Sequence, residues 1–254
     1  MNKNFTIVAN WKMYFTEKQA IDFLDKHFQA FRCLSAESQH KIVICPSFTD
    51  LALAIKMFSK TEIQIGAQDC ATNVIGAFTG QTSAARLRFL GCSHCIVGHS
   101  ERRIHNGENP EIVAQKALRA LESHLSPIIC IGETLADYEA EETYNTLLSQ
   151  LAPIFQAFAT TTQPQTIYFA YEPVWAIGTN HPASVEHLEK VFDWLQNKLR
   201  TELNNTENKL LYGGSVTSAN APKFVNVAKL DGFLVGGAST DFPEFEKIVK
   251  CCNT

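Results

Sequence analysis

Glu172 is a candidate catalytic base. It directly follows an apolar run, residues 167–171, and precedes a loop of unusually apolar composition, residues 173–179 (PVWAIGT). A glutamate at the end of a strand is more often a solvated loop residue, but an ordinary surface connection is more polar than this loop. We therefore interpret the loop as a lid that closes over a ligand, excludes water and desolvates the carboxylate into a stronger base.

His99 and Lys12 follow other apolar runs in the same way. His99 comes after residues 94–98 and before residues 100–103 (SERR), which can begin a helix. The N-terminal dipole of such a helix disfavours the imidazolium form and would keep the ring of His99 neutral. A hydrogen-bonded buried histidine without a chemical role is the alternative. Lys12 could be a plain surface lysine, and only its place at the end of a strand recommends it.

These side chains can act together only if the fold brings the ends of their strands to one place. Eight short runs are apolar nearly throughout, the pattern of strands buried on both faces. They are residues 5–9, 41–45, 63–67, 94–98, 127–131, 167–171, 209–212 and 232–235. Segments with helical spacing of apolar residues lie between them, among them 20–28, 113–121, 185–199 and 245–249.

The strict alternation of strands and helices predicts parallel strands joined by right-handed crossovers. Eight units without a polar edge strand favour a closed α/β barrel of the (β/α)8 type over an open doubly wound sheet. We expect one domain over residues 1–254. In such a barrel the loops after the strands form the active face, which is where Lys12, His99 and Glu172 stand.

Two glycine pairs follow the last two runs. Gly213 and Gly214 precede Ser215, and Gly236 and Gly237 come directly after the final strand. A backbone without Cβ can approach an anion closely and direct successive N–H groups at it. Turns also use such pairs, but loops after the seventh and eighth strands form the usual phosphate site of this fold. The pairs therefore predict phosphate binding.

Composition narrows the classes of function. The net charge of −4 provides no basic stripe that could neutralise the phosphates of a nucleic acid. The first residues do not have the pattern of a signal peptide, and no apolar run approaches the length of a membrane span. We therefore expect a cytoplasmic protein that binds a small molecule, with no nucleic-acid or membrane partner.

The eight cysteines do not point to a metal or a redox centre. Cys92 and Cys95 have C-x-x-C spacing, but a structural zinc site needs a second pair, which the adjacent Cys251 and Cys252 do not supply. A redox pair would open a helix, whereas Cys95 leads into an apolar run. We expect small buried thiols, no metal and no cofactor.

Seven segments of the chain together resemble the triosephosphate isomerase family. They are residues 9–13 (ANWKM), 76–80 (GAFTG), 97–103 (VGHSERR), 130–133 (CIGE), 170–179 (AYEPVWAIGT), 212–216 (YGGSV) and 231–239 (DGFLVGGAS). They run in order from the first strand to the last, which makes the combination highly specific. The resemblance implies a cofactor-free interconversion of dihydroxyacetone phosphate and D-glyceraldehyde 3-phosphate through an enediol(ate), in glycolysis and gluconeogenesis.

The resemblance also implies a role for each site residue, and this family is a standard example of a glutamate base paired with a neutral histidine. Glu172 would abstract the proton next to the carbonyl, while His99 would polarise the carbonyl and move a proton between the two oxygens. Asn10 and Lys12 would stabilise negative charge, and Lys12 would also balance the phosphate. The remaining contacts to the phosphate would come from Gly178, Ser215, Gly236 and Gly237. Supporting residues would be Glu101, Cys130 and Thr79.

Members of the family are usually homodimers in which the loop after the third strand reaches the partner's site. Residues 68–79 form such a long loop here, and Thr79 would touch the partner. Two features depart from the family pattern. Gln81 replaces a glutamate that commonly pairs with an arginine across the interface, and residues 180–182 (NHP) replace a Gly-Lys pattern behind the lid.

Two alternatives fit the sequence less well. Another phosphate-binding barrel enzyme, such as an aldolase using Schiff-base chemistry, would need a lysine at the end of a middle strand. The fourth, fifth and sixth runs are instead followed by His99, Gly132 with Glu133, and Glu172. A non-catalytic barrel that binds a sugar phosphate should have lost Lys12, His99 or Glu172, and all three are present.

Overall fold

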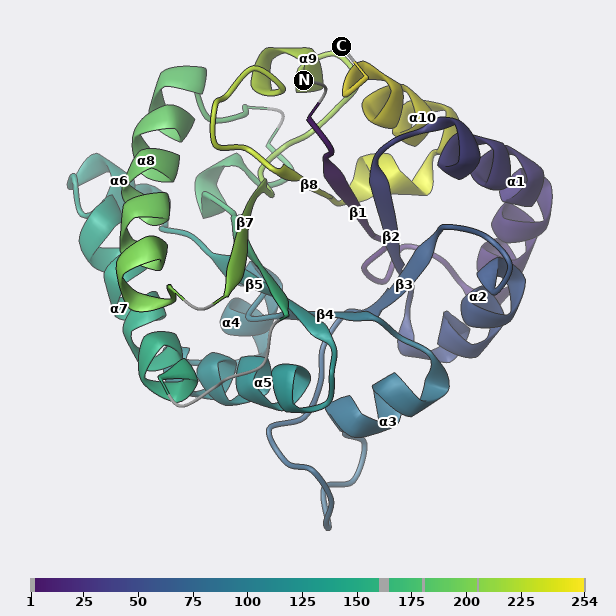
Figure 1. Cartoon of the computed structure of the whole chain (residues 1–254), viewed down its shortest axis with the longest axis horizontal. Helices are drawn as coiled ribbons and strands as arrows, with labels where there is room; N and C mark the ends of the chain where they lie inside the picture. Colours follow the sequence, from purple (N-terminus) through teal and green to yellow (C-terminus); the bar gives the residue numbers. More distant parts are fainter. Residues whose placement is uncertain (1–2, 160–164, 180, 205, 254) are drawn as a thin grey trace.

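Eight parallel strands close into a barrel, with each strand paired to the next and β8 paired to β1 (Figure 1). The computed structural model describes residues 3–159, 165–179, 181–204 and 206–253. The strands are β1 (Thr6–Asn10), β2 (Lys41–Cys45), β3 (Gln64–Ala67), β4 (His94–Val97), β5 (Ser126–Ile131), β6 (Thr166–Tyr171), β7 (Glu207–Tyr212) and β8 (Gly232–Val235). The predicted (β/α)8 class is confirmed, and each strand lies within two residues of its predicted bounds.

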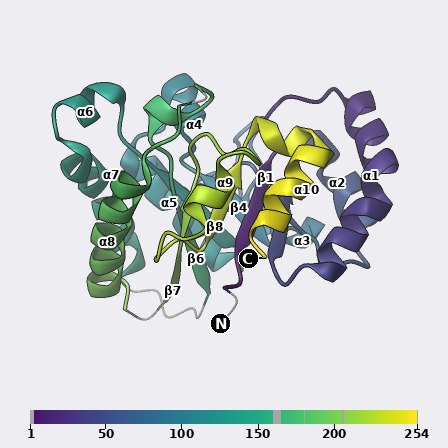
Figure 2. The same cartoon turned by 90° about the horizontal axis from the view of Figure 1, so that it is seen from above.

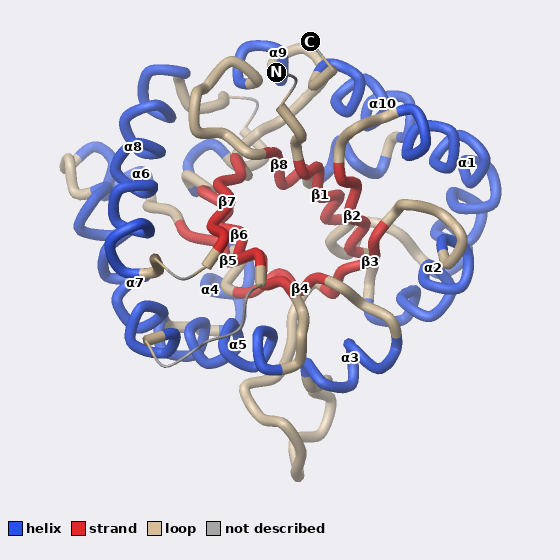
Figure 3. The backbone as a smooth tube through the Cα atoms, viewed as in Figure 1, coloured by secondary structure: helices blue, strands red, loops and turns tan. Residues whose placement is uncertain are grey.

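Helices surround the barrel on its outer side (Figure 3). They are α1 (Glu17–Glu37), α2 (Leu51–Phe58), α3 (Ala84–Leu90), α4 (Ser100–Asn106), α5 (Pro110–Glu122), α6 (Leu135–Glu139), α7 (Thr143–Phe158), α8 (Val185–Glu202), α9 (Ala221–Phe224) and α10 (Phe242–Cys251). Side chains at several helix starts satisfy backbone N–H groups that have no partner within the helix. Asn109 caps α5, where Pro110 occupies the first turn, and Ser184 caps α8.

The strands are apolar nearly throughout because each contributes to two apolar layers. One layer fills the barrel interior, with Val8, Val43, Ile96, Ile128 and Leu211 among its members. The other lies between the strands and the surrounding helices and contains most of the buried apolar side chains. Successive residues of a strand point to opposite faces, so both sets of positions must be apolar.

The barrel has two different ends. Figure 2 shows α4 and α6, the first helices after β4 and β5, together at one end of the barrel. Because the strands are parallel, all of their carboxyl ends meet there, and this end is where the candidate site residues were expected. The chain between β3 and α3 extends away from the barrel wall as a long loop (Figures 1 and 3).

Burial of the cysteines agrees with the sequence interpretation in all but two positions. Cys33 is exposed and Cys251 is half-buried, while the other six are buried. In the part of the chain that the structure describes, no helix has the length and apolarity needed to cross a membrane.

Candidate active site

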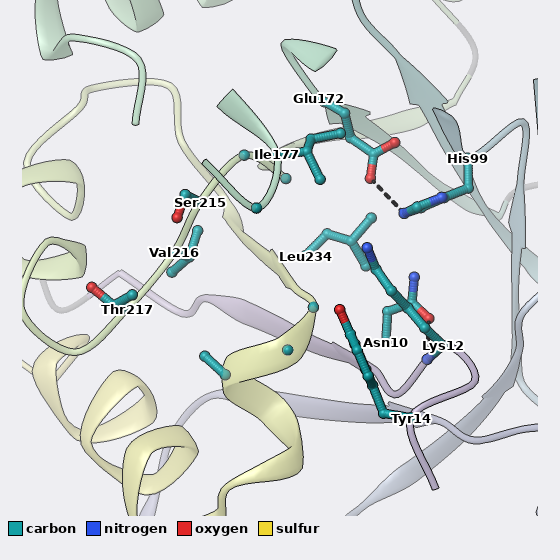
Figure 4. Close-up of a pocket in the computed structure, with 16 residues that line it drawn as sticks. Asn10, Lys12, Tyr14, His99, Glu172, Ile177, Ser215, Val216, Thr217 and Leu234 are labelled. Atoms are coloured by element: carbon teal, nitrogen blue, oxygen red, sulfur yellow. Dashed lines mark hydrogen bonds and ion pairs between the residues drawn. The ribbon is translucent and has the colours of Figure 1, made fainter. Parts of the chain in front are cut away.

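The carboxyl ends of the strands surround a cavity of about 190 Å³ (Figure 4). All eight residues predicted to act in catalysis or substrate binding line it, namely Asn10, Lys12, His99, Glu172, Gly178, Ser215, Gly236 and Gly237. They come from the ends of β1, β4, β6, β7 and β8. The cavity is also lined by Tyr14 and Leu234, which the sequence analysis did not single out.

Glu172 lies at the end of β6 with only 2% of its surface exposed. Its Oε1 is 3.3 Å from Nε2 of His99, and its Oε2 accepts a hydrogen bond from the N–H of Ser100 at 3.3 Å. The side chain fits there only because residue 213 is glycine: a Cβ at that position would lie 2.7 Å from Cγ of Glu172. Gly213 therefore makes room for the carboxylate as well as lining the cavity.

His99 caps the N-terminus of α4, as the sequence predicted. Its Nδ1 accepts a hydrogen bond from the N–H of Glu101 at 3.2 Å. A proton on Nδ1 would point at that N–H group, so the contact requires a neutral ring with its proton on Nε2. Nε2 faces Glu172 and the cavity (Figure 4). The ring is thus oriented to offer an N–H group to a ligand.

Lys12 adopts a backbone conformation that is rare for a residue with a side chain, with φ of 50°. A left-handed backbone costs roughly 1–2 kcal/mol outside glycine. Three hydrogen bonds hold it. The N–H of Lys12 donates to Oδ1 of Asn10 at 3.1 Å, and Nε2 of Gln68 and Oγ of Ser47 donate to the carbonyl of Lys12 at 2.8 and 3.2 Å. Strain of this kind, fixed by its surroundings, is characteristic of functional positions.

The ammonium of Lys12 lies 2.7 Å from Oε1 of Glu101. Partial burial of Glu101 raises the pKa of its carboxyl, but the hydrogen bond from Lys12 and nearby positive charge outweigh burial and leave the pKa lowered. Glu101 therefore stays ionised at neutral pH, and its contact with Lys12 fixes the position of the ammonium group beside the cavity. The supporting role that the resemblance implies for Glu101 stays a prediction, and the structure shows its contact with Lys12.

The glycine-rich end of the cavity lies beside the lysine. A Cβ at position 236 would be 3.3 Å from Cε of Lys12, which is a tight approach for any larger residue. Gly237 begins a 3₁₀ helix, η3 (Gly237–Thr240), and the first N–H groups of such a helix have no partner within it. Together with the lysine, this backbone can bind an anion.

The lid begins with a 3₁₀ turn, η2 (Val174–Ala176), and the N–H of Ser215 donates to the carbonyl of Ala176 at 3.0 Å. Gly178 has a positive φ of 67°, which favours glycine at this position. The lid thus already contacts the loop after β7.

Residues 180–182, which depart from the family pattern behind the lid, are described only in part, because Asn180 lies outside the described residues. The N–H of His181 donates to Oγ1 of Thr179 at 3.2 Å, and the N–H of Ala183 donates to the hydroxyl of Tyr212 at 3.0 Å. Beyond Pro182, the rear of the lid is therefore tied to β7.

The other two supporting residues lie in different surroundings. Cys130 is buried inside the barrel, and its pKa is well above the usual range because of burial and then the nearby Glu172 carboxylate, so it stays a neutral thiol. Thr79 is exposed on the loop after β3 and does not line the cavity of its own chain. The sequence analysis gave Gly132 no structural role, but a Cβ at this position would lie only 1.9 Å from the carbonyl oxygen of Glu172, so the close approach of the two strand ends requires glycine.

No group of three or more histidine, cysteine, aspartate or glutamate side chains is placed to hold a metal ion among the residues that the structure describes. The cavity offers one carboxylate, one imidazole and one ammonium over a glycine-rich backbone. A (β/α)8 barrel with such a site belongs to the class of barrel enzymes that act on small phosphorylated molecules.

Comparison with known proteins narrows the class to one family. The family model described as triosephosphate isomerase matches residues 5–252. Relatives named triosephosphate isomerase include one from Aquifex aeolicus, 38% identical over 96% of this chain and 97% of its own, and one from Solibacter usitatus, 41% identical over the same shares. A third, from Hahella chejuensis, is 42% identical over 82% of this chain and 84% of its own. The chain belongs to the triosephosphate isomerase family.

Proposed function

We propose that the protein is a triose-phosphate isomerase that interconverts dihydroxyacetone phosphate and D-glyceraldehyde 3-phosphate through an enediol(ate), with the site residues acting as described below. The observation that carries the proposed mechanism is the pairing of a buried carboxylate with a neutral imidazole, Glu172 and His99, at 3.3 Å on the wall of one cavity. Such a pair can remove a proton from carbon and deliver one to oxygen. The reaction places the enzyme in glycolysis and gluconeogenesis, and we propose that it acts in the cytoplasm.

In this mechanism Glu172 is the base. It is ionised when substrate arrives, removes the proton from the carbon next to the carbonyl, and returns it to the neighbouring carbon. With 2% of its surface exposed, the carboxylate is largely shielded from water, so the proton it removes is transferred in a site from which solvent is excluded. Because Ser100 and His99 each contact a different oxygen, the carboxylate is held in one orientation.

His99 and Lys12 stabilise the charge that develops on the substrate oxygens. The Nε2–H of His99 donates to the carbonyl oxygen as it becomes an enolate oxygen, and the ring then carries a proton between the two oxygens. The ammonium of Lys12 and the side-chain amide of Asn10 act from the end of β1. These donors are fixed before substrate binds, which is why they favour the transition state.

The phosphate binds at the glycine-rich end of the cavity. Gly236 and Gly237 contribute backbone N–H groups, Ser215 contributes from the loop after β7, and the lid contributes the N–H of Gly178. Closing the lid brings the N–H of Gly178 onto the phosphate and excludes water from the reacting carbons. Binding energy from the phosphate, which does not react, thereby orders the site for the reaction.

A coupled assay tests the proposed activity directly. Purified protein is mixed with D-glyceraldehyde 3-phosphate, and dihydroxyacetone phosphate is followed through its NADH-dependent reduction by an added dehydrogenase. We expect rapid conversion with the phosphorylated substrate and at most trace conversion of unphosphorylated glyceraldehyde. Equal activity on both compounds would show that the phosphate site has been assigned wrongly.

Removal of metal ions should leave the activity unchanged. The proposed mechanism uses only Glu172, His99, Lys12 and Asn10, so dialysis against EDTA followed by metal-free buffer is expected to preserve kcat and KM. The check is the same coupled assay before and after dialysis, with the coupling enzyme confirmed to tolerate EDTA. Activity that disappears and returns with added zinc would contradict the mechanism.

We propose in addition that the protein is a homodimer. Apolar side chains are strongly exposed on the loops that follow the first three strands: Met13 and Ile75 are 91% and 90% exposed, and Phe48, Val74 and Phe78 are 45–55% exposed. Large exposed apolar patches mark interaction surfaces, and these five side chains are the candidates for one here. A second copy of the chain would cover these loops, and Thr79 would then lie close to the partner's cavity.

We propose that Arg102, which contacts Asp69 at the start of the loop after β3, is the arginine that a glutamate at position 81 would face across the dimer interface. The replacement by Gln81 then does not weaken this dimer, because Arg102 has carboxylate partners in its own chain. Its NH2 lies 2.9 Å from Oδ2 of Asp69, and its Nε lies 2.7 Å from Oε1 of Glu108. The arginine therefore needs no carboxylate from the partner to balance its charge.

An aspartate at the tip of the long loop should dissociate the dimer. Ile75→Asp would place a charge in the apolar interface, and we expect dimer affinity to fall on the order of tenfold or more because the charge loses its hydration there. Activity per chain should fall with it. Sedimentation velocity across a dilution series measures the affinity, with Gln196→Asp on the exposed face of α8 as control. A wild-type protein that is monomeric and fully active at nanomolar concentration would contradict the proposed dimer.

A further inference from the structure

Two hydrogen bonds join the front of the lid, residues 174 and 175, to Glu133, whose carboxylate is fully buried. Nε1 of Trp175 donates to Oε1 of Glu133 at 2.9 Å, and the N–H of Val174 donates to the carbonyl of Glu133 at 3.0 Å. The Glu133 side chain has no exposed surface, and its Oε2 has no hydrogen-bond partner within the described part of the chain. The donors that hold this carboxylate therefore converge on a single oxygen.

A histidine that the proposed mechanism does not use joins the same group. Nε2 of His187, in the first turns of α8, lies 2.7 Å from the hydroxyl of Tyr171, and that hydroxyl lies 2.9 Å from Oε1 of Glu133. The His187 ring also packs against Trp175, with ring centroids 5.9 Å apart, and against Tyr138 at 5.1 Å.

The chemistry of these groups fixes the direction of the hydrogen bonds. A carboxylate only accepts, and a tyrosine hydroxyl has one hydrogen, so Tyr171 donates to Glu133. The hydroxyl oxygen of Tyr171 must then accept from His187, which requires the proton of His187 to sit on Nε2. His187 therefore donates to the hydroxyl of Tyr171, and this hydroxyl donates to Oε1 of Glu133. The indole N–H of Trp175 donates to the same oxygen of Glu133.

We propose that His187 is a positioning residue for the lid: its Nε2–H orients the Tyr171 hydroxyl onto Glu133 and so fixes the carboxylate that anchors Trp175. These hydrogen bonds link the front of the lid to α8, the helix that follows the rear end of the lid. The proposal rests on the proposed isomerase function in one respect only, that lid movement is part of turnover.

The electrostatic surroundings of His187 agree with a neutral donor. The titratable groups that face it are Glu133 after β5, Tyr138 in α6, Tyr171 in β6 and Lys190 in its own helix. Burial lowers the pKa of His187 most, the Glu133 carboxylate opposes this in part, and Lys190 adds to the lowering. At neutral pH the ring is therefore uncharged, and one nitrogen is available to donate.

The sign of the pH effect follows from the lowered pKa. The folded protein binds a proton at His187 less readily than the unfolded chain does. At a pH above the usual pKa of histidine, about 6.5, the ring is neutral in both states and its titration does not affect the free energy of unfolding. Stability is lost as the pH falls through that value. Protonation leaves Nε2–H in place and adds a positive charge 3.9 Å from Oε1 of Glu133, so the environment of the Trp175 indole should change as His187 titrates.

The test follows the indole N–H signals of the three tryptophans by 15N NMR, with Trp175 assigned through Trp175→Phe. His187→Leu removes the donor, and we expect the Trp175 N–H to exchange with water about threefold to tenfold faster, the range expected for one lost hydrogen bond. We expect kcat to change while KM for the substrate changes little. His187→Gln keeps an N–H donor at similar reach and should restore the exchange rate.

Two further variants keep the test decisive. Tyr171→Phe removes the hydroxyl and leaves His187 in place, so it should give the same faster exchange even if His187→Leu folds poorly, and the two changes combined should add little to either. Lys190→Met, one turn along α8, should leave the exchange rate of the Trp175 N–H at neutral pH unchanged. The pH dependence of the Trp175 signal at acid pH should be absent in His187→Gln.

Unchanged Trp175 exchange in both His187→Leu and Tyr171→Phe would overturn the proposal. So would equal exchange in His187→Leu and His187→Gln if both are faster than wild type, because the loss would then come from packing rather than from the donor. The NMR signals require no turnover, so these outcomes are distinguishable from failure of the wild-type enzyme in the isomerase assay.

Discussion

In Glu172→Gln we expect kcat to fall by about 10²–10⁴-fold, the usual contribution of a general base, with further loss because the site excludes water. Glutamine keeps the shape of the side chain and can still accept from the N–H of Ser100, which contacts Oε2 of the glutamate at 3.3 Å. It lacks the basic oxygen that removes the proton. KM should change much less, since the phosphate is bound at the other end of the cavity.

Two further variants serve as comparisons for Glu172→Gln. Glu172→Asp keeps a carboxylate but withdraws it by one methylene, so its activity should lie between those of Glu172→Gln and the wild type. Glu189→Gln, on an exposed face of α8, should have wild-type activity. If Glu172→Gln exchanged the α-hydrogen of the substrate with solvent at nearly the wild-type rate, another group would have to be the base.

The largest effect on stability is expected from Lys116→Met. Lys116 is 5% exposed, and its Nζ lies 2.7 and 2.8 Å from the two oxygens of Asp69 and 2.6 Å from Oε1 of Glu108. Breaking a buried ion pair by removing one partner costs about 3–5 kcal/mol because the other charge is left without compensation. Here two carboxylates would lose their shared cation, and Arg102 would still contact both.

The loss in Lys116→Met should depend on pH. Burial raises the pKa of Asp69, and the charges of Lys116 and Arg102 limit the rise. Without the lysine the pKa of Asp69 should rise further in the folded protein. At a pH above the usual pKa of aspartate, the unfolded chain then carries the ionised carboxylate more favourably than the folded protein does, which destabilises the fold. The destabilisation should therefore be largest at neutral pH and smaller as the pH falls towards the titration of the carboxylates.

Urea unfolding at equal protein concentrations measures this effect, since the stability of a dimer depends on concentration. Lys190→Met is the matched control because it breaks an exposed ion pair. The side chains of Lys190 and Glu186 are 64% and 77% exposed. Midpoints that are the same for wild type and Lys116→Met at pH 7 would show that the buried cluster contributes nothing to folding.

The barrel and the location of its site could be predicted from the sequence because each depends on local patterns. A strand buried on both faces must be apolar along its length, so β5 and β6 are visible as continuous runs. In a parallel barrel the end of every strand faces the same way, so His99 and Glu172 could be expected to meet without knowledge of the distance between them.

The side-chain networks could not be predicted, because they depend on how distant elements pack. Nothing next to Glu133 in the sequence indicates that it is completely buried, or that Tyr171, Trp175 and His187 converge on it from β6, the lid and α8. Gln81 illustrates the same limit. Position 81 alone suggests a loss for the interface, and the sequence gives no sign that Arg102 has two acidic partners in its own chain, Asp69 and Glu108.

The central claim is that this site isomerises triose phosphates by moving a proton, and isotope exchange tests it most directly. Wild-type protein is incubated with dihydroxyacetone phosphate in D₂O, and both sugars are examined by proton NMR. We predict that D-glyceraldehyde 3-phosphate forms with deuterium at C2 in part of the product and that recovered dihydroxyacetone phosphate gains deuterium at the carbon bearing its hydroxyl. Conversion with no deuterium in either sugar would indicate hydride transfer, and it would contradict the assignment of Glu172 as a base that exchanges its proton with solvent.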